Sequence, residues 1–360
     1  MNTKGDTVIK TILAFSFIVF LSACGGGTSP ENEKYVGSNQ NYTPYVDVTL
    51  FPLFDFNTSL EEGIKSYTMA FVNSPKDEYK CRPVWHDYSK YSIENSELDL
   101  VNKIEMLQEN GGDVTISFGG AAAKDNELAT VCSDANTLLS AYQEVLDKTK
   151  VKIFDFDIEG ENISKSDNID KRVLAIKKLQ ENNSELEISF TLSSNPESGL
   201  SADGVSLIEK VKKAGIKIRS INLMLMDFGE AYPAKLHGGL KMAEYSILAL
   251  KEANKQLHTI YDKNSTQSSV NGEYYHLLGA VAMIGQNDIL SEVFYLEDVK
   301  KLYDFCKKEG VYITSIWSLN RDKAITRGES KTTELEKSSK LSSGVYGSND
   351  FAFSKILNLK

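Results

Sequence analysis

The chain has 360 residues, of which 41% are hydrophobic and 25% charged. This composition excludes disordered, collagen-like and disulfide-scaffold proteins, and the length allows either two domains or one large barrel. The 40 basic and 50 acidic residues give a formal net charge of −10, so we expect the surface to repel nucleic acid and anionic lipid headgroups. A neutral or cationic partner fits this charge better.

The first 44 residues are expected to lie outside the fold. Two lysines precede an apolar run at residues 12–21, which is typical of a signal peptide that ends at residue 23. The Leu-Ser-Ala-Cys string that follows resembles the lipobox of bacterial lipoproteins. This resemblance implies export and a lipid on Cys24 that anchors the protein to the cell envelope, at the outer membrane. Secretion after a plain signal peptide is the alternative. Residues 24–44 are rich in Gly, Ser, Asn and Pro and predict a flexible tether.

From Tyr45 onward, short runs rich in Val, Ile and Phe alternate with longer amphipathic stretches, which is typical of repeated β-α units. We predict eight strands, at residues 45–51, 66–72, 113–118, 152–158, 187–192, 220–226, 277–283 and 313–318. The helical patterns cover residues 98–109, 136–148, 170–182, 204–214, 243–256, 296–309 and 350–357. Eight such units over about 310 residues predict a single (β/α)8 TIM barrel at residues 45–360. An open doubly wound sheet is the alternative, but no G-x-G-x-x-G motif follows the first strand.

The fourth predicted strand carries three acidic residues in alternation with apolar ones. Asp155, Asp157 and Glu159 share one face because side chains alternate along a strand, and the apolar face is expected to pack under the helices. The acids would then line the barrel near the carboxyl ends of the strands, where barrel enzymes have their sites. Three like charges there are costly, so at least one acid should hold a proton at neutral pH. A magnesium site is the alternative, although such ligands usually come from several strands.

The cysteines and histidines show no metal-ligand spacing, so we predict no metal site and no cofactor. After Cys24 three cysteines remain, Cys81, Cys132 and Cys306, and they allow at most one internal disulfide. Cys306 lies in an apolar helical pattern and is expected to be a small buried side chain.

Four strand ends together resemble glycoside hydrolase family 18. The family's hallmark on strand four is D-x-x-D-x-D-x-E; here the last three acids match, and Lys152 replaces the first, which is usually treated as structural. Strand three ends S-F-G-G at residues 117–120, like the family's S-x-G-G. Strand six ends M-L-M-D at residues 224–227, close to M-x-Y-D. Strand eight continues W-S-L-N-R-D at residues 317–322, like a bacterial chitinase subgroup.

The resemblance implies a substrate-assisted, retaining hydrolysis of β-1,4 linkages between N-acetylglucosamine units, in chitin or its oligosaccharides. Glu159 would protonate the leaving oxygen, with a pKa raised by its carboxylate neighbours. The acetamido oxygen of the sugar would attack the anomeric carbon. Asp157 would stabilise the resulting oxazolinium ion and pass its proton to Asp155, so the two aspartates would titrate together.

The remaining motif positions imply contacts with the sugar. Trp317 offers a flat face for stacking, and Asp227 is expected to hydrogen-bond the sugar. Met226 stands where many members have a tyrosine that supports the acetamido carbonyl, and a thioether cannot donate a hydrogen bond. Met224, Gly119 and Gly120 complete the implied site. Phe51 at the end of strand one and Trp85 after strand two are further candidates for stacking, with packing in the core or a loop as the alternative.

The resemblance also implies a disulfide between Cys81 and Cys132, whose predicted loops are neighbours on the active face. We expect a monomer whose partners are the carbohydrate substrate and, through the lipid alone, the membrane. Three alternatives stay open: an endo-β-N-acetylglucosaminidase acting on the chitobiose core of N-glycans, a noncatalytic glycan-capture lipoprotein, and a metal-dependent lyase or isomerase.

Overall fold

The computed structural model describes residues 41–78, 80–232, 241–262, 274–324, 340–345 and 349–358. The predicted signal peptide, Cys24 and most of the predicted tether lie outside these residues. Within the described ranges, no helix is both long enough and apolar enough to cross a membrane.

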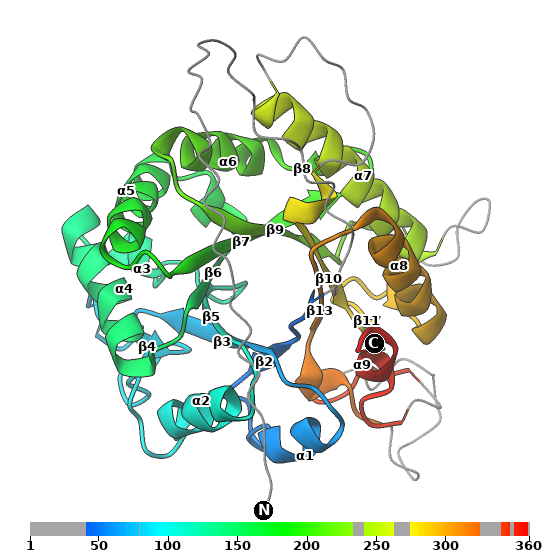
Figure 1. Ribbon diagram of the computed structural model, residues 1–360, viewed down its shortest axis with the longest axis horizontal. Coiled ribbons are helices and arrows are strands. Elements are labelled where there is room, and N and C mark those ends of the chain that lie inside the picture. Colours follow the sequence, from blue (N-terminus) through cyan, green and yellow to red (C-terminus); the bar gives the residue numbers. More distant parts are fainter. Residues whose placement is uncertain are drawn as a thin grey trace, which may run out of the picture. The chain divides into compact units, whose positions relative to one another are not determined.

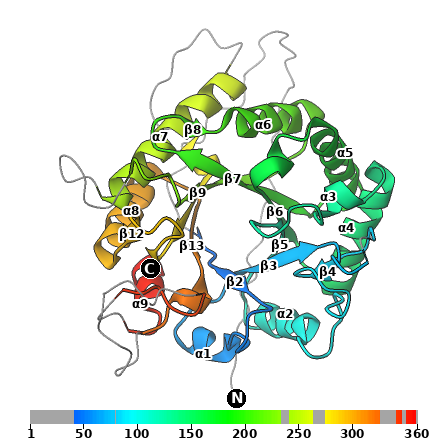
Figure 2. The same ribbon diagram turned by 180° about the vertical axis from the view of Figure 1, so that it is seen from behind.

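Eight parallel strands form a barrel with the helices around it, as Figure 1 and, from behind, Figure 2 show. In order around the barrel they are β2 (Tyr45–Asp47), β3 (Tyr67–Asn73), β5 (Val114–Gly119), β6 (Ile153–Ile158), β7 (Glu187–Asn195), β9 (Ile218–Leu225), β10 (Leu278–Met283) and β13 (Ile313–Trp317). The prediction of a (β/α)8 TIM barrel is confirmed.

The barrel closes at its first segment. The short strand β1 (Asn41–Tyr42) pairs with β13, and β2, which follows it directly, pairs with β3. Asn320, just after β13, joins the same seam, because its side chain bonds the main-chain N and O of Asp47 at 2.9 and 3.1 Å. The predicted tether reaches residue 44, whereas Asn41 and Tyr42 already belong to the sheet.

Seven of the helices match predicted ones to within five residues at each end, whereas α1 and α3 were not predicted. They are α1 (Phe56–Glu61), α2 (Leu100–Glu109), α3 (Leu128–Val131), α4 (Ala135–Thr149), α5 (Ser166–Asn182), α6 (Ala202–Ala214), α7 (Met242–Tyr261), α8 (Leu296–Glu309) and α9 (Ala352–Leu357). Gly215 and Gly310 end α6 and α8 with φ of 75° and 77°, a conformation that glycine adopts without a steric cost.

Short elements in the connections were not predicted. They are β4 (Val84–Trp85) paired with β3, β8 (Gly199–Leu200) paired with β7, the hairpin of β11 (Gly285–Gln286) and β12 (Val293–Phe294), and three 3-10 turns at Gly160–Ile163, Tyr275–Leu277 and Leu319–Arg321. Runs of two to four residues are too short to show a periodicity.

The first strand is shorter than predicted and ends at Asp47 instead of residue 51. The Asp47 carboxylate accepts hydrogen bonds from the N–H and hydroxyl of Thr49, at 3.2 and 3.0 Å. This local turn competes with continuation of the strand, because aspartate bonds the backbone two residues on.

The two faces of β6 separate as expected. Phe154 and Phe156 pack against Phe118 of β5 and, for Phe156, also against Tyr142 of α4, with ring centroids 4.9 to 5.3 Å apart. This face lies between the barrel and the helices. The other face, with Asp155 and Asp157, therefore points into the barrel.

Candidate active site

Three acidic residues follow one another along the inside of the barrel on β6 and just beyond it. Asp155 and Asp157 are 1% and 5% exposed, and Glu159, directly after the strand, is intermediate in exposure. Their environments differ in the number of hydrogen bonds and in the charges nearby, so each carboxyl group has a different affinity for a proton.

Asp155 is the most fully hydrogen-bonded of the three. Its carboxyl group accepts from Ser117 Oγ at 2.7 Å, Tyr45 OH at 2.9 Å, Thr191 Oγ1 at 2.9 Å and Asn222 Nδ2 at 3.4 Å. These donors come from four other strands of the barrel. Burial raises the pKa of Asp155, and the four hydrogen bonds oppose that rise because they favour the charged form.

Asp157 has the strongest tendency to hold a proton. Burial raises its pKa well above the ordinary value, and the charges of Glu159 and Asp155 raise it further. Asp157 also shares a hydrogen bond with Glu159. Its Oδ1 has no hydrogen-bond partner among the described residues. The protonated carboxyl group can therefore donate to Glu159 while one oxygen stays available to a ligand.

The pKa of Glu159 is raised to about 7. Burial is the largest cause, followed by the charge of Asp227; Asp288 adds to the rise, and the hydrogen bond with Asp157 opposes it. The prediction that carboxylate neighbours supply this shift is therefore correct only in part. The acids that raise the pKa come from the loops after β9 and β10, and the neighbour on β6 lowers it.

The acids open into a cavity of about 350 Å³ at the carboxyl ends of the strands. The predicted site residues that line it are Gly119, Asp157, Glu159, Met224, Met226, Asp227 and Trp317. Asp155 does not line it and lies deeper along β6. The cavity is also lined by Arg321 of the W-S-L-N-R-D string and by side chains that no motif indicated, among them Tyr45, Phe71, Asn73, Asn126 and Asp288.

Aromatic rings form one surface of this cavity. Trp317 stacks with Phe71 at a centroid distance of 5.5 Å and meets Tyr45 edge-on at 5.9 Å. Met226 and Val281 pack against the same group. Sequence reasoning missed Phe71 and Tyr45, because an aromatic residue inside a strand ordinarily indicates core packing.

Gly119 and Gly120 leave no room for side chains. A Cβ on Gly119 would lie 2.1 Å from the main-chain O of Asp157, and one on Gly120 would lie 2.6 Å from the ring of Phe71. Both residues have positive φ, at 101° and 81°. Glycine at these two positions lets β5 approach β6 and lets the Phe71 ring lie beside the site. Gly120 itself does not line the cavity.

The structure places the two weaker stacking candidates away from the cavity, and for Trp85 it bears out the alternative of core packing. Phe51 is 52% exposed, lies beyond the end of β2 and does not line the cavity, because the strand stops at Asp47. Trp85 is 0% exposed on β4, and its indole N–H donates to the main-chain O of Ile93 at 3.3 Å. Trp85 is therefore a core residue.

Two buried asparagines present acceptor oxygens at the cavity. The side-chain nitrogens of Asn73 and Asn126 donate to the main-chain oxygens of Gly119 and Ser74, each at 2.9 Å. A main-chain carbonyl can only accept, so the orientation of each amide is determined. Neither side-chain oxygen has a partner among the described residues. Asn73 ends β3, but nothing in the sequence around Asn126 indicated a site.

The W-S-L-N-R-D string divides into a part that faces the cavity and a part that holds the fold. Trp317 and Arg321 line the cavity. Arg321 donates to the main-chain oxygens of Ile284 and Gln286, and burial lowers its pKa to about 10. The Asp322 carboxylate accepts from the N–H and hydroxyl of Ser354, at 2.8 and 2.6 Å, and so holds α9.

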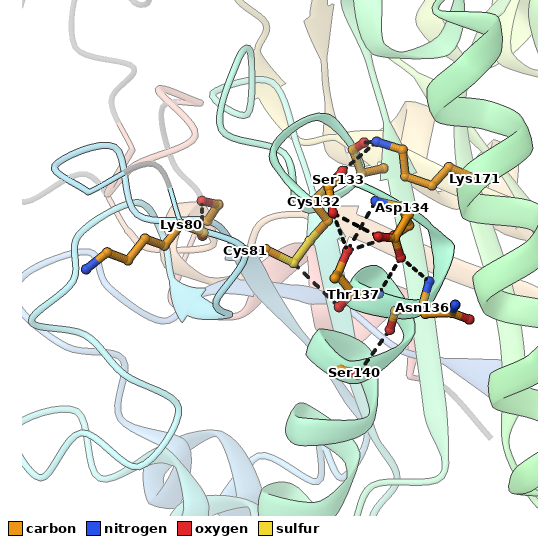
Figure 3. Close-up of a disulfide and its surroundings, with 11 residues drawn as sticks. Lys80, Cys81, Cys132, Ser133, Asp134, Asn136, Thr137, Ser140 and Lys171 are labelled. Carbon is orange, nitrogen blue, oxygen red and sulfur yellow. Dashed lines mark hydrogen bonds between the residues drawn. A yellow bond between two sulfur atoms is a disulfide. The ribbon is translucent and has the colours of Figure 1, made fainter.

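Cys81 and Cys132 form a disulfide between the loop after β3 and the end of α3 (Figure 3). This is the pairing that the family resemblance implies. Next to it, the Asp134 side chain accepts from the N–H groups of Asn136 and Thr137, at 2.8 and 2.9 Å, and caps α4. Cys306 is free and buried.

In the described part of the chain, no three His, Cys, Asp or Glu side chains are grouped as a metal ion requires.

The family model described as glycosyl hydrolases family 18 matches residues 34–271. The probable bifunctional chitinase/lysozyme of Escherichia coli (strain K12) is 32% identical over 293 residues, which cover 78% of this chain and 31% of that protein. Endochitinase 11 of Metarhizium anisopliae is 31% identical over 295 residues, which cover 78% of this chain and 52% of that protein. The chain thus spans about a third and about half of the length of these two relatives.

Solved structures match as well. The catalytic domain of the hyperthermophilic chitinase from Pyrococcus furiosus has a TM-score of 0.72 and 28% identity, with 89% of this chain and 95% of that chain covered. Catalytic site mutants of its active domain 2 complexed with chito-oligosaccharides give a TM-score of 0.73 at the same identity and coverage. Because the family model matches more than half of the chain, the chain belongs to glycosyl hydrolases family 18.

Proposed function

We propose that the chain hydrolyses β-1,4 linkages between N-acetylglucosamine units of chitin or its oligosaccharides, with retention of configuration at the anomeric carbon. One observation carries the proposal: the row of Asp155, Asp157 and Glu159, with a different environment for each carboxyl group. Relatives that are named chitinases support a substrate of the chitin type.

Glu159 is proposed as the general acid. A carboxyl group with a pKa of about 7 is about half protonated at neutral pH, so it can donate a proton to the leaving glycosidic oxygen and take one back from water. Burial and the charge of Asp227 supply that proton affinity.

Asp157 and Asp155 are proposed to support attack by the acetamido oxygen of the substrate. The free Oδ1 of Asp157 can accept a hydrogen bond from the acetamido N–H, which stabilises the positive charge of the oxazolinium ion. Asp157 must be charged at that moment. Asp155 lies two residues away on the same face of β6, and burial raises its pKa, so it can take up the proton.

The other side chains of the cavity suit a sugar ring. Trp317 supplies a flat apolar face, and Met226 extends this apolar surface without donating a hydrogen bond. Asn73 and Asn126 can accept hydrogen bonds from sugar hydroxyls through their unpartnered oxygens. A pyranose ring has an apolar face that can stack on an aromatic ring and hydroxyl groups that can donate to the acceptor oxygens.

Proton NMR of a fresh digest tests the proposal. With N-acetylglucosamine oligomers of defined length, the β-anomer of the new reducing end should appear first and then equilibrate. Oligomers without acetyl groups should react far more slowly, since they lack the attacking oxygen. An initial burst of α-anomer, or equal rates on the deacetylated oligomers, would contradict the mechanism. A high-mannose glycoprotein in parallel distinguishes the endo-β-N-acetylglucosaminidase activity, and binding without turnover of any substrate would indicate glycan capture.

A further inference from the structure

Two loops on one side of the cavity hold each other through acidic side chains. Glu292, just before β12, is 0% exposed, and its Oε1 accepts from the main-chain N of Gly229 at 2.8 Å. In the opposite direction, Oδ1 of Asp227 accepts from the main-chain N of Ile289 at 2.9 Å. We call these four residues the acid brace. Each loop therefore supplies the carboxylate that binds the backbone of the other.

The turn after β9 depends on this support. Asp227 has φ of 50° and Gly229 has φ of 120°, and the left-handed region is uncommon for a residue that is not glycine. The N–H groups of residues 227 and 228 also face the Glu292 carboxyl group, although only that of Gly229 is in hydrogen-bond geometry. Successive N–H groups arranged in this way form a site for an anion, and Glu292 occupies it. Its carboxylate thus stabilises the backbone conformation that directs Asp227 into the cavity.

Asp227 is the member of the brace that reaches the proposed acid. It lines the cavity, and after burial its charge is the largest cause of the raised pKa of Glu159. Glu292 does not line the cavity, and it is not among the leading causes of the raised pKa of Glu159. Its hydrogen bond to Gly229 instead connects it to the turn that carries Asp227.

We propose that Glu292 is a positioning residue that holds the turn at residues 227–229 and thereby keeps the Asp227 carboxylate beside Glu159. The inference rests on the proposed function only in treating Glu159 as the general acid. The interaction between the two loops stands apart from the substrate.

The charged and titratable groups around the brace give it a pH range. Asp227 and Tyr245 of α7 face Glu292, while Asp288 and Arg321 face Asp227. Burial raises the pKa of Glu292 to about 7. Above this pH Glu292 is charged and accepts the backbone hydrogen bonds strongly; below it, the protonated group accepts them weakly. The hydrogen bonds of the brace are therefore strongest above pH 7, where Glu159 tends to lose its proton. By keeping Asp227 in place there, the brace keeps the pKa of Glu159 raised and opposes the loss of activity at alkaline pH.

Direct titration of Glu159 tests the inference without any substrate. The protein is labelled with carboxyl-¹³C glutamate, and the signal that is absent from Glu159→Gln identifies Glu159. In the Glu292→Ala variant we expect the pKa of Glu159 to fall by about half a unit to one unit, because the Asp227 carboxylate is no longer held in place. The alkaline limb of the kcat/KM profile should move by the same amount. Glu292→Gln keeps an acceptor oxygen without the charge, so it should fold and shift the titration less, in the same direction.

A double-mutant cycle shows whether Glu292 acts through Asp227. Asp227→Asn alone should lower the pKa of Glu159, and adding Glu292→Ala or Glu292→Gln to it should produce no further shift. Glu230→Gln is the matched control, because the exposed Glu230 bonds Ser291 of the facing loop at 3.0 Å but does not line the cavity. It should leave the titration unchanged.

Two results would overturn the inference: an unchanged titration in both Glu292 variants, or an equal shift with and without Asp227. The NMR titration needs no turnover, so it separates this inference from the proposed function. A shift that follows the cycle in a protein without activity on chitin oligomers would refute the function and keep the brace.

Discussion

The loops on the two sides of the cavity are held together by different interactions. The first wall consists of residues 74–78, 80–87 and 120–132, after β3 and β5. The second consists of residues 227–230 and 284–292, after β9 and β10. The strand order places these pairs across the barrel from each other. The disulfide of Cys81 and Cys132 crosses the first wall, whereas the acid brace holds the second.

The first wall is held by an ion pair and a main-chain hydrogen bond in addition to the disulfide. Lys76 bonds Asp87 at 2.8 Å, and the main-chain N of Ser74 bonds the main-chain O of Asn126 at 2.9 Å. Burial opposes the ionisation of Asp87, but hydrogen bonds from Lys76 and His86 outweigh it and lower the pKa. A covalent bond and an ion pair with a carboxylate of lowered pKa thus hold the first wall, whereas a buried carboxyl group with a raised pKa holds the second.

Both walls surround the proposed general acid Glu159. The Glu159→Gln variant tests this role and has the largest expected effect. Turnover of N-acetylglucosamine oligomers should fall by about 10² to 10⁴-fold, because the amide cannot protonate the leaving oxygen. Oligomer affinity, measured by calorimetry, should change little. Glu161→Gln is the control, since Glu161 is exposed two residues further along the chain. Full turnover by the Glu159→Gln variant would show that Glu159 is not the acid that both walls position.

Removing the disulfide tests the first wall alone. Cys81 and Cys132 are 51 residues apart, and opening a loop of that length should lower the free energy of unfolding by about 2 to 4 kcal/mol. In the Cys81→Ala, Cys132→Ala double variant we also expect KM to rise several-fold while the alkaline limb of the pH profile stays in place. A reducing agent should destabilise the wild type but not this variant. A shift of the alkaline limb in this variant would mean that the first wall also affects the pKa of Glu159.

The pH dependence of stability tests the second wall, with the smallest expected effect. The pKa of Glu292 is raised from 4.5 to about 7 by folding, so the folded state binds this proton more tightly than the unfolded state. The cost of burying the charge outweighs the stronger hydrogen bonds that the charged group makes to the turn. Global stability is therefore highest below about pH 4.5 and falls as the pH rises through 7.

Urea unfolding of wild type and Glu292→Gln between pH 4.5 and 8 measures this effect. The amide does not titrate, so the wild type should lose on the order of 1 to 3 kcal/mol relative to the variant over that range. The disulfide variant should instead follow the wild-type pH dependence in parallel. Parallel curves for Glu292→Gln would mean that the second wall does not titrate as described.

Several positions show how far local pattern can predict a site. The seven strands after the first begin within two residues of their predicted starts, because each is a distinct run of β-branched and aromatic residues. Phe51 and Trp85 were assigned to sugar stacking for their residue type and approximate place. The direction of a side chain beyond a strand end depends on the turn that follows, and at Phe51 that turn begins at Asp47.

The sequence by itself determined the order of the barrel strands and the row of acids on β6, because both follow from alternation between residues close together in the chain. Only the tertiary structure decided which residues meet across the cavity. Phe71 lies against Trp317, and Glu292 holds the turn at Asp227, although these partners are far apart in sequence. Such contacts depend on the burial and backbone conformation of two loops at once, and no periodicity along one segment encodes that.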